Sequence, residues 1–382
     1  MRILHTSDWH LGRSFHRVGM LEHQAAFVDH LVGAVTSEGI DAVVVAGDVY
    51  DRALPAVDTV ALLDDALCRL RAAGAQVVLT SGNHDSPGRL GFASRVLEQG
   101  GVHLRTRLAD LARPVLLSDD HGPVAIYGLP YLEPAMTADP LGAVRTHQGV
   151  LTAAMQRVRA DLATRGPSTR SLVAAHAFVV GGQASDSERD ITVGGVGAVP
   201  VSVFAGVDYV ALGHLHGRQQ LQPTVRYSGS PLTYSFSEAH HSKGSWIVDL
   251  TPRATVVEPL PAPVPRPLAL LRGRIDDLMV DPALGHAEQA WCQVVLTDVV
   301  RPRAAMARLR TRFGHTLSLA FEPEGGAADR ADYGTRVRGR SDLDVCCGFV
   351  KHVRGAAPDD DERAVLAAAL DRAGELERGD AA

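Results

Sequence analysis

About the first 260 residues of this sequence alternate short apolar runs with amphipathic helical patterns, and this alternation restricts the possible folds more than any other feature. The runs "RILHTS", "DAVVVAG" and "AQVVLTSG" are typical of buried strands. Phe27, Leu31 and Val35 repeat at four-residue spacing and predict a helix within 22–40, and similar spacing predicts a second helix within 57–74. Strands that alternate with helices indicate βαβ units and a largely parallel sheet covered by helices.

The later part of the chain predicts a second sheet and two smaller regions. Strands are expected at "PVAIYGLP", "SLVAAHAFV", "VDYVALGH" and "SWIVDL", and their more direct succession favours a second, mixed sheet packed on the first. The proline-rich segment 256–268 is either a stiff linker or an extended edge. Short strand and helix patterns follow, then a polar Gly/Arg-rich stretch, then two helical patterns. We therefore expect an α/β domain at 1–262, a capping domain at 263–325, and a linker with a helical tail at 326–382.

Polar side chains gather where the predicted strands end. Successive strands are followed by Asp8 and His10, by Asp48, by Asn83, His84 and Asp85, by His176, and by His214 and His216. In an open α/β sheet, ligands bind outside the carboxyl ends of the strands, so these residues would meet at one rim. The Asp-x-His and His-x-His spacings agree with this, because residues i and i+2 of an extended backbone point the same way. Any one of these residues alone is more often a turn former, a helix cap or a core histidine, but five such strand ends in order along the chain are not explained in that way.

The combination of carboxylate, imidazole and amide oxygen indicates a metal site. Such a donor set suits Mn²⁺, Fe²⁺ or Zn²⁺ better than Ca²⁺ or Cu⁺. Without His84 and Asp85, the set offers seven candidate ligands, which are too many for one ion but suit two ions that share a bridging carboxylate, roughly 3.5–4 Å apart.

Several other classes of protein are disfavoured. The net charge of −6 does not by itself suggest nucleic-acid binding, and the four cysteines form no CxxC pair, so we expect reduced thiols. No apolar run approaches the roughly 18 residues of a membrane span, and the first residues do not resemble a signal peptide, which favours a cytoplasmic protein without membrane contact. Neither a G-x-S-x-G nucleophile motif nor a P-loop is present.

The order D-x-H, G-D, G-N-H-D, H, G-H-x-H resembles that of the calcineurin-like metallophosphoesterases. The flanks "MRILHTSDWHLGR", "AGDVYDR", "SGNHDSPGRLGF" and "YSGSPLTYSFSEAHHSKG", and the tail "FVKHVRGAAPDDDERAVLAAAL", are similar to those of the SbcD family, the nuclease subunits of bacterial SbcCD complexes. The resemblance covers nearly the whole chain. It implies an α/β fold with a four-layer α/β/β/α sandwich, a small αβ capping domain and a helical C-terminal tail.

The resemblance also implies a ligand set. Asp8, His10 and His216 would bind the first ion, Asn83, His176 and His214 the second, and Asp48 would bridge the two. The family favours two manganese ions, which lower the pKa of water and hold the phosphate oxygens. Because the Asn83 amide is neutral, it would ligate without placing further negative charge beside an incoming phosphate.

Four neighbouring residues receive roles in the same way. His84 would stabilise the transition state and protonate the leaving oxygen, for which an unperturbed pKa near 6.5 is suitable. Asp85 would orient His84 or, in the interpretation that we prefer, brace the loop. Asp51 stands where archaeal and eukaryotic relatives have a second catalytic histidine. With Arg52 it resembles the protein serine/threonine phosphatases instead, in which such an aspartate supports the catalytic histidine.

The implied activity is hydrolysis of DNA phosphodiester bonds, in DNA repair, recombination and replication. It comprises endonuclease activity on single strands and hairpins and, with an SbcC-type ATPase, ATP-dependent exonuclease activity on duplexes. The absence of a P-loop requires that this ATPase is another chain, and the family implies a homodimer. Arg13, Arg52 and Arg89 are candidate DNA-phosphate contacts, although a structural salt bridge explains Arg52 equally well. The alternatives are a small-molecule phosphodiesterase or phosphatase of the same superfamily, which would not need the cap and tail, and an inactive scaffold subunit, which would have lost ligands.

Overall fold

The computed structural model describes residues 1–188, 197–324 and 340–379, with the side chains of 374–379 excepted. The chain forms two compact units, Met1–Pro265 and Arg266–Ala382, and each is described by itself. Within the described part of the chain, no helix is long and apolar enough to cross a membrane. All four cysteines are free thiols, in agreement with the sequence.

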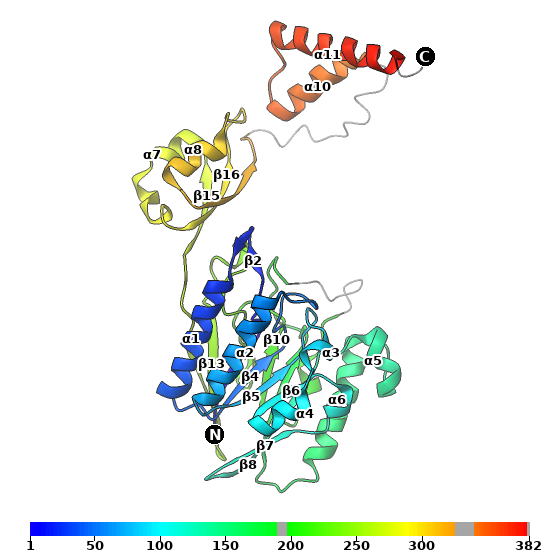
Figure 1. Cartoon of the computed structure of the whole chain (residues 1–382), viewed down its shortest axis with the longest axis vertical. Coiled ribbons are helices and arrows are strands. Elements are labelled where there is room, and N and C mark those ends of the chain that lie inside the picture. The colour runs from blue at the N-terminus through cyan, green and yellow to red at the C-terminus, as the bar shows by residue number, and fades with distance from the viewer. Residues whose placement is uncertain (189–196, 325–339, 380–382) are drawn as a thin grey trace. The chain divides into compact units, whose positions relative to one another are not determined.

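The first unit contains two six-stranded sheets (Figure 1). The first sheet has the order β14 (Thr255–Pro261), β13 (Gly244–Leu250), β1 (Arg2–Thr6), β4 (Ala42–Ala46), β5 (Gln76–Thr80), β6 (Val102–Arg105). β1, β4, β5 and β6 are parallel, and β13 and β14 are antiparallel additions. The proline-rich segment is therefore an extended edge strand as far as Pro261, rather than a linker.

The second sheet is mixed, as the sequence predicts. Its order is β11 (Gln219–Gln222), β12 (Val225–Tyr227), β10 (Tyr209–Gly213), β9 (Arg170–His176), β8 (Gly122–Leu129), β7 (Val115–Asp119). β12, β10, β9 and β8 are parallel, and the two edge strands are antiparallel to their neighbours. The spatial order of the strands therefore differs from their order along the chain.

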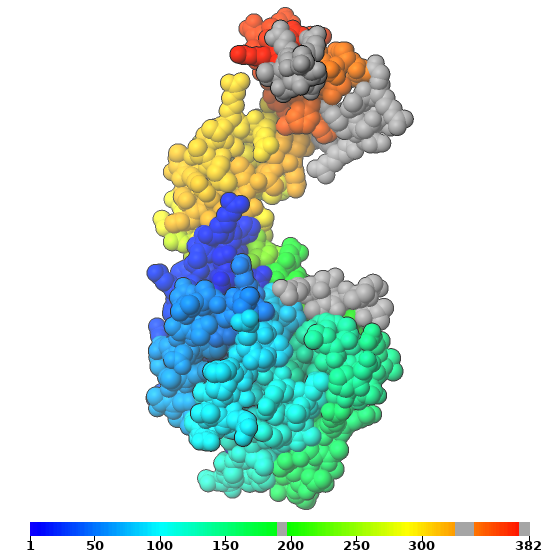
Figure 2. All heavy atoms as spheres, turned by 45° about the vertical axis from the view of Figure 1, so that its right-hand side comes forward, coloured from blue at the N-terminus to red at the C-terminus, as the bar shows by residue number. Residues whose placement is uncertain are grey.

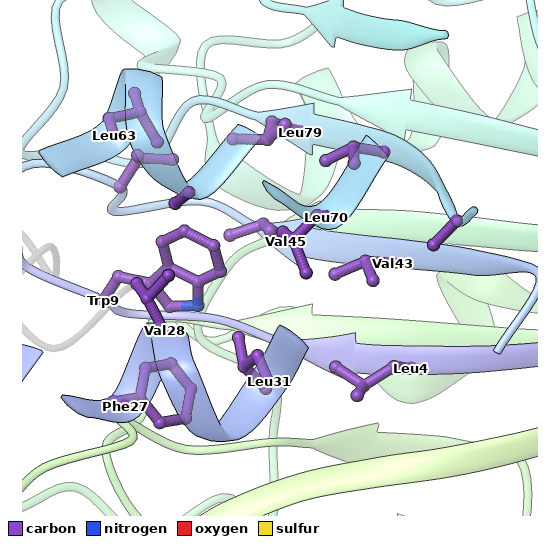
Figure 3. Close-up of a cluster of buried hydrophobic side chains, with 14 of the residues drawn as sticks. Leu4, Trp9, Phe27, Val28, Leu31, Val43, Val45, Leu63, Leu70 and Leu79 are labelled. Atoms are coloured by element: carbon purple, nitrogen blue, oxygen red, sulfur yellow. The ribbon is translucent and has the colours of Figure 1, made fainter. Parts of the chain in front are cut away.

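Three apolar layers separate the elements of this unit. The first lies between the first sheet and helices α1 (Leu21–Ser37) and α2 (Val57–Ala72), where Phe27 and Leu31 pack with Val45 (Figure 3). The second lies between the sheets and includes Val44. The third lies between the second sheet and helices α5 (Pro134–Leu141) and α6 (His147–Leu162). Because Val44 and Val45 alternate between two layers, β4 is buried on both faces. The predicted four-layer α/β/β/α fold is confirmed.

Short elements complete the first unit. They are the hairpin β2 (Ser14–Phe15) and β3 (Val18–Gly19), and the single-turn helices α3 (Pro87–Leu90) and α4 (Ser94–Leu97). Figure 2 shows the blue and cyan N-terminal segments and the green segments that follow them as adjoining parts of the surface of this unit.

The second unit contains a three-stranded parallel sheet and a helical hairpin. The sheet has the order β15 (Leu268–Gly273), β16 (Trp291–Leu296), β17 (Thr316–Phe321), with α7 (Ile275–Val280) and α8 (Ala305–Arg312) in the connections. The tail consists of α10 (Asp342–Arg354) and α11 (Asp360–Gly379), as the two helical patterns predict. At the start of α11, Asp359 accepts the Glu362 N–H and Glu362 accepts the Asp359 N–H, a reciprocal cap that fixes where the helix begins.

Candidate metal centre

The polar strand ends converge in the structure from both sheets of the first unit. Asp8, Asp48 and Asn83 follow β1, β4 and β5 of the first sheet, whereas His176 ends β9 and His214 and His216 follow β10 of the second. The loop after β1 continues beside the loop after β4, because the N–H groups of Asp8 and His10 donate to the carbonyl oxygens of Gly47 and Asp48 (3.1 and 3.0 Å). The carboxyl ends of the strands in both sheets therefore bring these side chains to one common centre.

The backbone at this centre is not extended. Eight non-glycine residues in the described segments have positive φ, and four of them are candidate ligands: Asp8 (52°), His10 (44°), Asp48 (47°) and His214 (105°). The expectation that Asp-x-His and His-x-His converge through an extended backbone is wrong at these positions. The left-handed conformation turns the side chains instead, and its cost of about 1–3 kcal/mol per residue is typical of functional sites.

Three glycines allow the loops to approach closely. A Cβ at Gly82 would lie 2.1 Å from an Asp48 carboxylate oxygen, and one at Gly213 would lie 1.9 Å from the Ala46 carbonyl oxygen. Gly47 has φ +84°, and a Cβ there would lie 2.4 Å from Nδ1 of His176. A larger residue at Gly47 or Gly82 would displace a candidate ligand, and one at Gly213 would displace the Ala46 carbonyl that accepts from His176, so the glycines are part of the site.

The first group of candidate ligands consists of Asp8, His10 and His216. One donor atom from each lies within 4.8 Å of the others, and Nε2 of His10 and Nε2 of His216 are 3.0 Å apart. The Asp8 carboxylate accepts the main-chain N–H of His214 (3.0 and 3.1 Å), which ties the two sheets together. All three side chains are completely or almost completely buried.

The second group surrounds His176. Its Nδ1 donates to the carbonyl oxygen of Ala46 (3.0 Å), so Nε2 faces the Asn83 amide oxygen (2.9 Å) and the Asp48 carboxylate (3.3 Å). The His214 ring lies beside that of His176, with 5.3 Å between the centroids. Asp48 also belongs to a cluster with His10 and His84, so it lies between the two groups.

Burial opposes charge on these groups. It raises the pKa of Asp8 to about 6, against the effect of His176 and His216, and it lowers the pKa of His214 to about 3, with help from His176. Burial also acts to raise the pKa of Asp48, but His176, His10 and His84 together outweigh it and hold that pKa well below the usual range. Divalent cations bind ionised carboxylates together with neutral imidazoles, so their charge suits this otherwise costly set. The inward-facing nitrogens and oxygens therefore fit such ions.

His84 lies at the edge of this centre. Its main-chain N–H donates to Asp48 (2.8 Å), its ring Nδ1 donates to the main-chain oxygen of Asp51 (2.9 Å), and its ring packs edge-on against that of His10. The carboxylate of Asp51 is 3.9 Å from Nδ1 of His84 but 3.6 Å from Nδ1 of His10, and it also lies 3.8 Å from Arg13. The backbone of Asp51, rather than its carboxylate, makes the hydrogen bond to His84.

The Asp85 side chain binds main-chain groups beside Asp48. Its carboxylate accepts the N–H groups of Val49, Tyr50 and Gly82 (3.1, 2.9 and 2.9 Å). This geometry joins the loop after β4 to the loop after β5 and favours the bracing interpretation over one in which Asp85 orients His84.

The three candidate DNA-contacting arginines occupy different environments. Arg13 is mostly buried beside the centre, donates to the Ser187 carbonyl oxygen (2.8 Å) and lies over the Tyr234 ring. Arg52 is 81% exposed and lies 3.7 Å from Asp51, and Arg89 is exposed on α3. Arg13 and Arg52 therefore lie beside a residue of the site, Asp51, whereas Arg89 stands on a neighbouring helix.

Sequence reasoning missed the residues that form hydrogen bonds to His10 and His216 of the first group without being candidate ligands themselves. Gln24 donates to the His10 carbonyl oxygen (2.8 Å) and to the Tyr234 hydroxyl (3.0 Å), which in turn donates to the Trp9 carbonyl oxygen (2.7 Å). Glu238 and Lys243 lie behind His216. The latter two stand in "SEAHHSKG", a segment already noted in the sequence, but neither follows the carboxyl end of a predicted strand, so nothing indicated their role.

The comparisons with known proteins agree with the motif order. The profile of the calcineurin-like phosphoesterases matches residues 1–218, and that of the type 5 capsule protein repressor C-terminal domain, SbcD_C, matches residues 264–354. A curated relative from Staphylococcus saprophyticus, the D subunit of the nuclease SbcCD, is 31% identical over 324 residues, which are 84% of each chain.

Among solved structures, a dimetal phosphatase from Danio rerio is 15% identical, with a TM-score of 0.43 over 68% of this chain and 95% of its own. The protein TT1561 of Thermus thermophilus is also 15% identical, with a TM-score of 0.39 over 68% of this chain and 98% of its own. These two likenesses are too distant to bear on the site. On the profile over 1–218 and the curated relative, the chain belongs to the calcineurin-like phosphoesterases and, within them, to the SbcD family.

Proposed function

We propose that this protein is a divalent-metal-dependent nuclease that hydrolyses phosphodiester bonds in DNA. The observation that carries the proposal is the convergence of two carboxylates, four imidazoles and one amide oxygen, supplied by five strand ends of two sheets, around one buried centre. Membership of the SbcD family, whose curated relative is named a nuclease, supports DNA as the substrate.

The candidate ligands divide into two groups that share Asp48. Asp8, His10 and His216 would hold one ion, and Asn83, His176 and His214 would hold the other, with Asp48 contributing to both. Mn²⁺ is our choice of metal, because this mixture of imidazole and oxygen donors suits it. Bound there, the ions supply neutralisation of the phosphate charge and a hydroxide nucleophile at neutral pH.

His84 serves the leaving group. Because Nδ1–H is held by the Asp51 carbonyl oxygen, Nε2 is the nitrogen that gains and gives up the catalytic proton. The hydrogen bond from the His84 main chain to Asp48 fixes the distance between this acid and the centre. A positioned imidazole of this kind protonates the departing alkoxide of the cleaved strand.

Asp51 and the arginines act around this core. The Asp51 carboxylate lies near His10 and Arg13, so we assign it to holding these two side chains rather than to proton transfer. Asp85 braces the loops through three main-chain hydrogen bonds. Arg13, Arg52 and Arg89 are proposed to contact phosphates of the DNA backbone.

The tail is proposed to bind an SbcC-type ATPase. No side chain of α10 is buried, and Phe349 and Val353 of α10 and Val365 of α11 are 56%, 46% and 69% exposed. Amphipathic helices with uncovered apolar side chains are typical of helix-in-groove recognition. We keep the division into a nuclease domain at 1–262, a cap at 263–325 and a linker and tail at 326–382 as part of this proposal, with the complex working in the cytoplasm.

A homodimer is proposed on a separate apolar surface. The first unit exposes Leu54, Val57 and Val60 at the start of α2, and Phe92 and Val96 near α4. Such side chains are usually covered when they form a contiguous patch, so they are candidates for the contact between two copies.

One assay tests the proposed function. The full chain, stripped of metal, is given Mn²⁺ and single-stranded, hairpin or duplex DNA, with and without SbcC and ATP. We expect cleavage of single strands and hairpins by the chain alone, and duplex degradation only with SbcC and ATP. Hydrolysis of a small phosphodiester without any cleavage of DNA would instead identify a small-molecule phosphodiesterase.

A further inference from the structure

Hydrogen bonds hold both the main chain and the ring of His216. Its main-chain N–H donates to Glu188 (2.7 Å), and its main-chain oxygen accepts from Nζ of Lys243 (2.9 Å). Its ring Nδ1 lies 2.6 Å from Oγ of Ser187 and 3.1 Å from Oε1 of Glu238. Because a carboxylate only accepts hydrogen bonds, Nδ1 carries the hydrogen and Nε2 faces His10.

Glu238 and Lys243 form a buried ion pair in which the partners are well satisfied. Lys243 donates to Glu238 (2.5 Å), to Ser230 (2.8 Å) and to the His216 carbonyl oxygen. Glu238 accepts from Lys243, from His216, from the Ser187 hydroxyl and from the Tyr234 N–H (3.2 Å). Removing two charges from water is costly, and a hydrophobic pair is often equally stable. The pair is therefore weak evidence for a role in stability, and its hydrogen bonds to the ring and the main chain of His216 point to a role there.

The two groups of candidate ligands differ in what stands behind their histidines. A carboxylate lies behind His216, whereas a main-chain carbonyl, that of Ala46, lies behind His176. A carboxylate in this place orients the imidazole and raises its basicity toward a metal. Asp8 clusters with His10 and His216, but it also clusters with Asp48 and His176, so its charge does not distinguish the two groups. The carboxylate behind His216 is therefore the difference that favours a cation in the first group.

We infer that Glu238 and Lys243 are a positioning pair that presets His216, so that the ion held by Asp8, His10 and His216 binds first and more tightly than the ion held by Asn83, His176 and His214. This inference rests on the proposed two-metal centre and adds an order of loading to it. It assigns a role to two residues that touch no substrate.

The test is a titration of the metal-free full chain with Mn²⁺. Binding is measured by calorimetry and by the loss of the electron paramagnetic resonance signal of free Mn²⁺. The wild type is expected to bind two ions in two resolved steps. The double variant Glu238→Gln/Lys243→Met keeps the volume and an amide oxygen near His216 but removes both charges. We expect the ratio of its two dissociation constants to fall about 10–100-fold, through weakening of the tighter step. Glu238→Asp, which restores the charge, is expected to recover part of the difference.

A matched control is the ion pair of Asp119 and Arg170, at 2.5 Å, which lies near the other end of β9 from His176. Asp119→Asn/Arg170→Met is expected to change the melting temperature while leaving both Mn²⁺ steps unchanged. Two equal steps in the wild type, or equal weakening of both steps in the Glu238/Lys243 variant, would overturn the inference. A wild-type chain that binds no Mn²⁺ would refute the proposed function instead. If the double variant does not fold, the single variant Glu238→Gln, which removes the carboxylate behind His216, carries the same comparison.

Discussion

The candidate metal centre and the helical tail differ in how far their own contacts bury and fix the side chains that matter most for their proposed roles. At the centre, Asp8 and Asp48 are 0% and 2% exposed, and main-chain hydrogen bonds fix both carboxylates. In the tail, Phe349 and Val365 are more than half exposed. The centre is preorganised, so in the proposed role it would need only ions and substrate. The tail leaves these apolar side chains exposed, and in the proposed docking role another surface would cover them.

Loss of the shared carboxylate is expected to have the largest effect. Asp48→Ala removes an anionic ligand from both groups and the acceptor of the His84 N–H. We expect no measurable cleavage of DNA and at most one ion per chain, measured by nuclease assay and elemental analysis. Asp65→Ala, an exposed carboxylate on α2, is the control and should behave as wild type. Wild-type cleavage by Asp48→Ala would rule out a shared-ligand centre.

Loss of the proposed acid should separate binding from chemistry. His84→Gln is expected to keep both ions and DNA binding while turnover falls by about 10²–10⁴. The measurements are metal content, DNA affinity in Ca²⁺ and single-turnover rates in Mn²⁺. If one ion were missing from this variant, His84 would be reassigned as a ligand, as its cluster with His10 and Asp48 allows.

Deletion of the tail tests the other side of the comparison. A chain that ends at residue 340 retains every candidate ligand, so Mn²⁺-dependent cleavage of single strands should be unchanged. Co-purification with SbcC, and with it ATP-stimulated duplex degradation, should be lost. A stable complex with the truncated chain would show that the tail is not the principal docking site.

Single apolar substitutions should give the smallest effects and the sharpest contrast in stability. Leu31→Ala in α1 leaves a cavity in a fully buried layer and should lower the free energy of unfolding by about 2–5 kcal/mol. Val365→Ser in α11 should change it by less than about 0.5 kcal/mol, because that side chain is 69% exposed. Chemical denaturation of both variants measures the difference. The same Val365→Ser change should nevertheless weaken binding to SbcC, and an equal loss of stability in both variants would mean that the tail packs as a core.

Much of the fold follows from local pattern. Continuous apolar runs predicted β1, β4 and β5 because strands buried on both faces leave no room for polar alternation. The helices α1 and α2, and the two helices of the tail, followed from apolar spacing and the glycine or aspartate at their ends. The sequence did not predict β6, β7, β11 or β12, because β6, β11 and β12 have only three or four residues and β7 and β11 are edge strands with partly exposed side chains.

The candidate site was predictable as a set of residues but not as a geometry. Strand ends identified the residues that meet, because parallel strands deliver their carboxyl ends to one edge. The left-handed backbone of Asp8 and His10 was not foreseen, since only close contacts between loops impose it. The roles of Glu238 and Gln24 also depend on tertiary contacts, with His216 and with the loop after β1, that no sequence spacing records. Whether the seven residues bind metal remains a prediction.

Because the candidate ligands come from two sheets, the thickness of the hydrophobic layer between the sheets sets the distance between those ligands. Asp8 and Asp48 follow strands of the first sheet, and His176 ends a strand of the second. The small residues Ala46 and Ala174 lie in the layer between the sheets and help to set the distance between them. A methyl group added inside this layer would move the two sheets apart without altering any candidate ligand. In the proposed metal-binding role, substitutions among residues of this layer, which lie outside the candidate ligands, would therefore change the size of ion that the centre accepts.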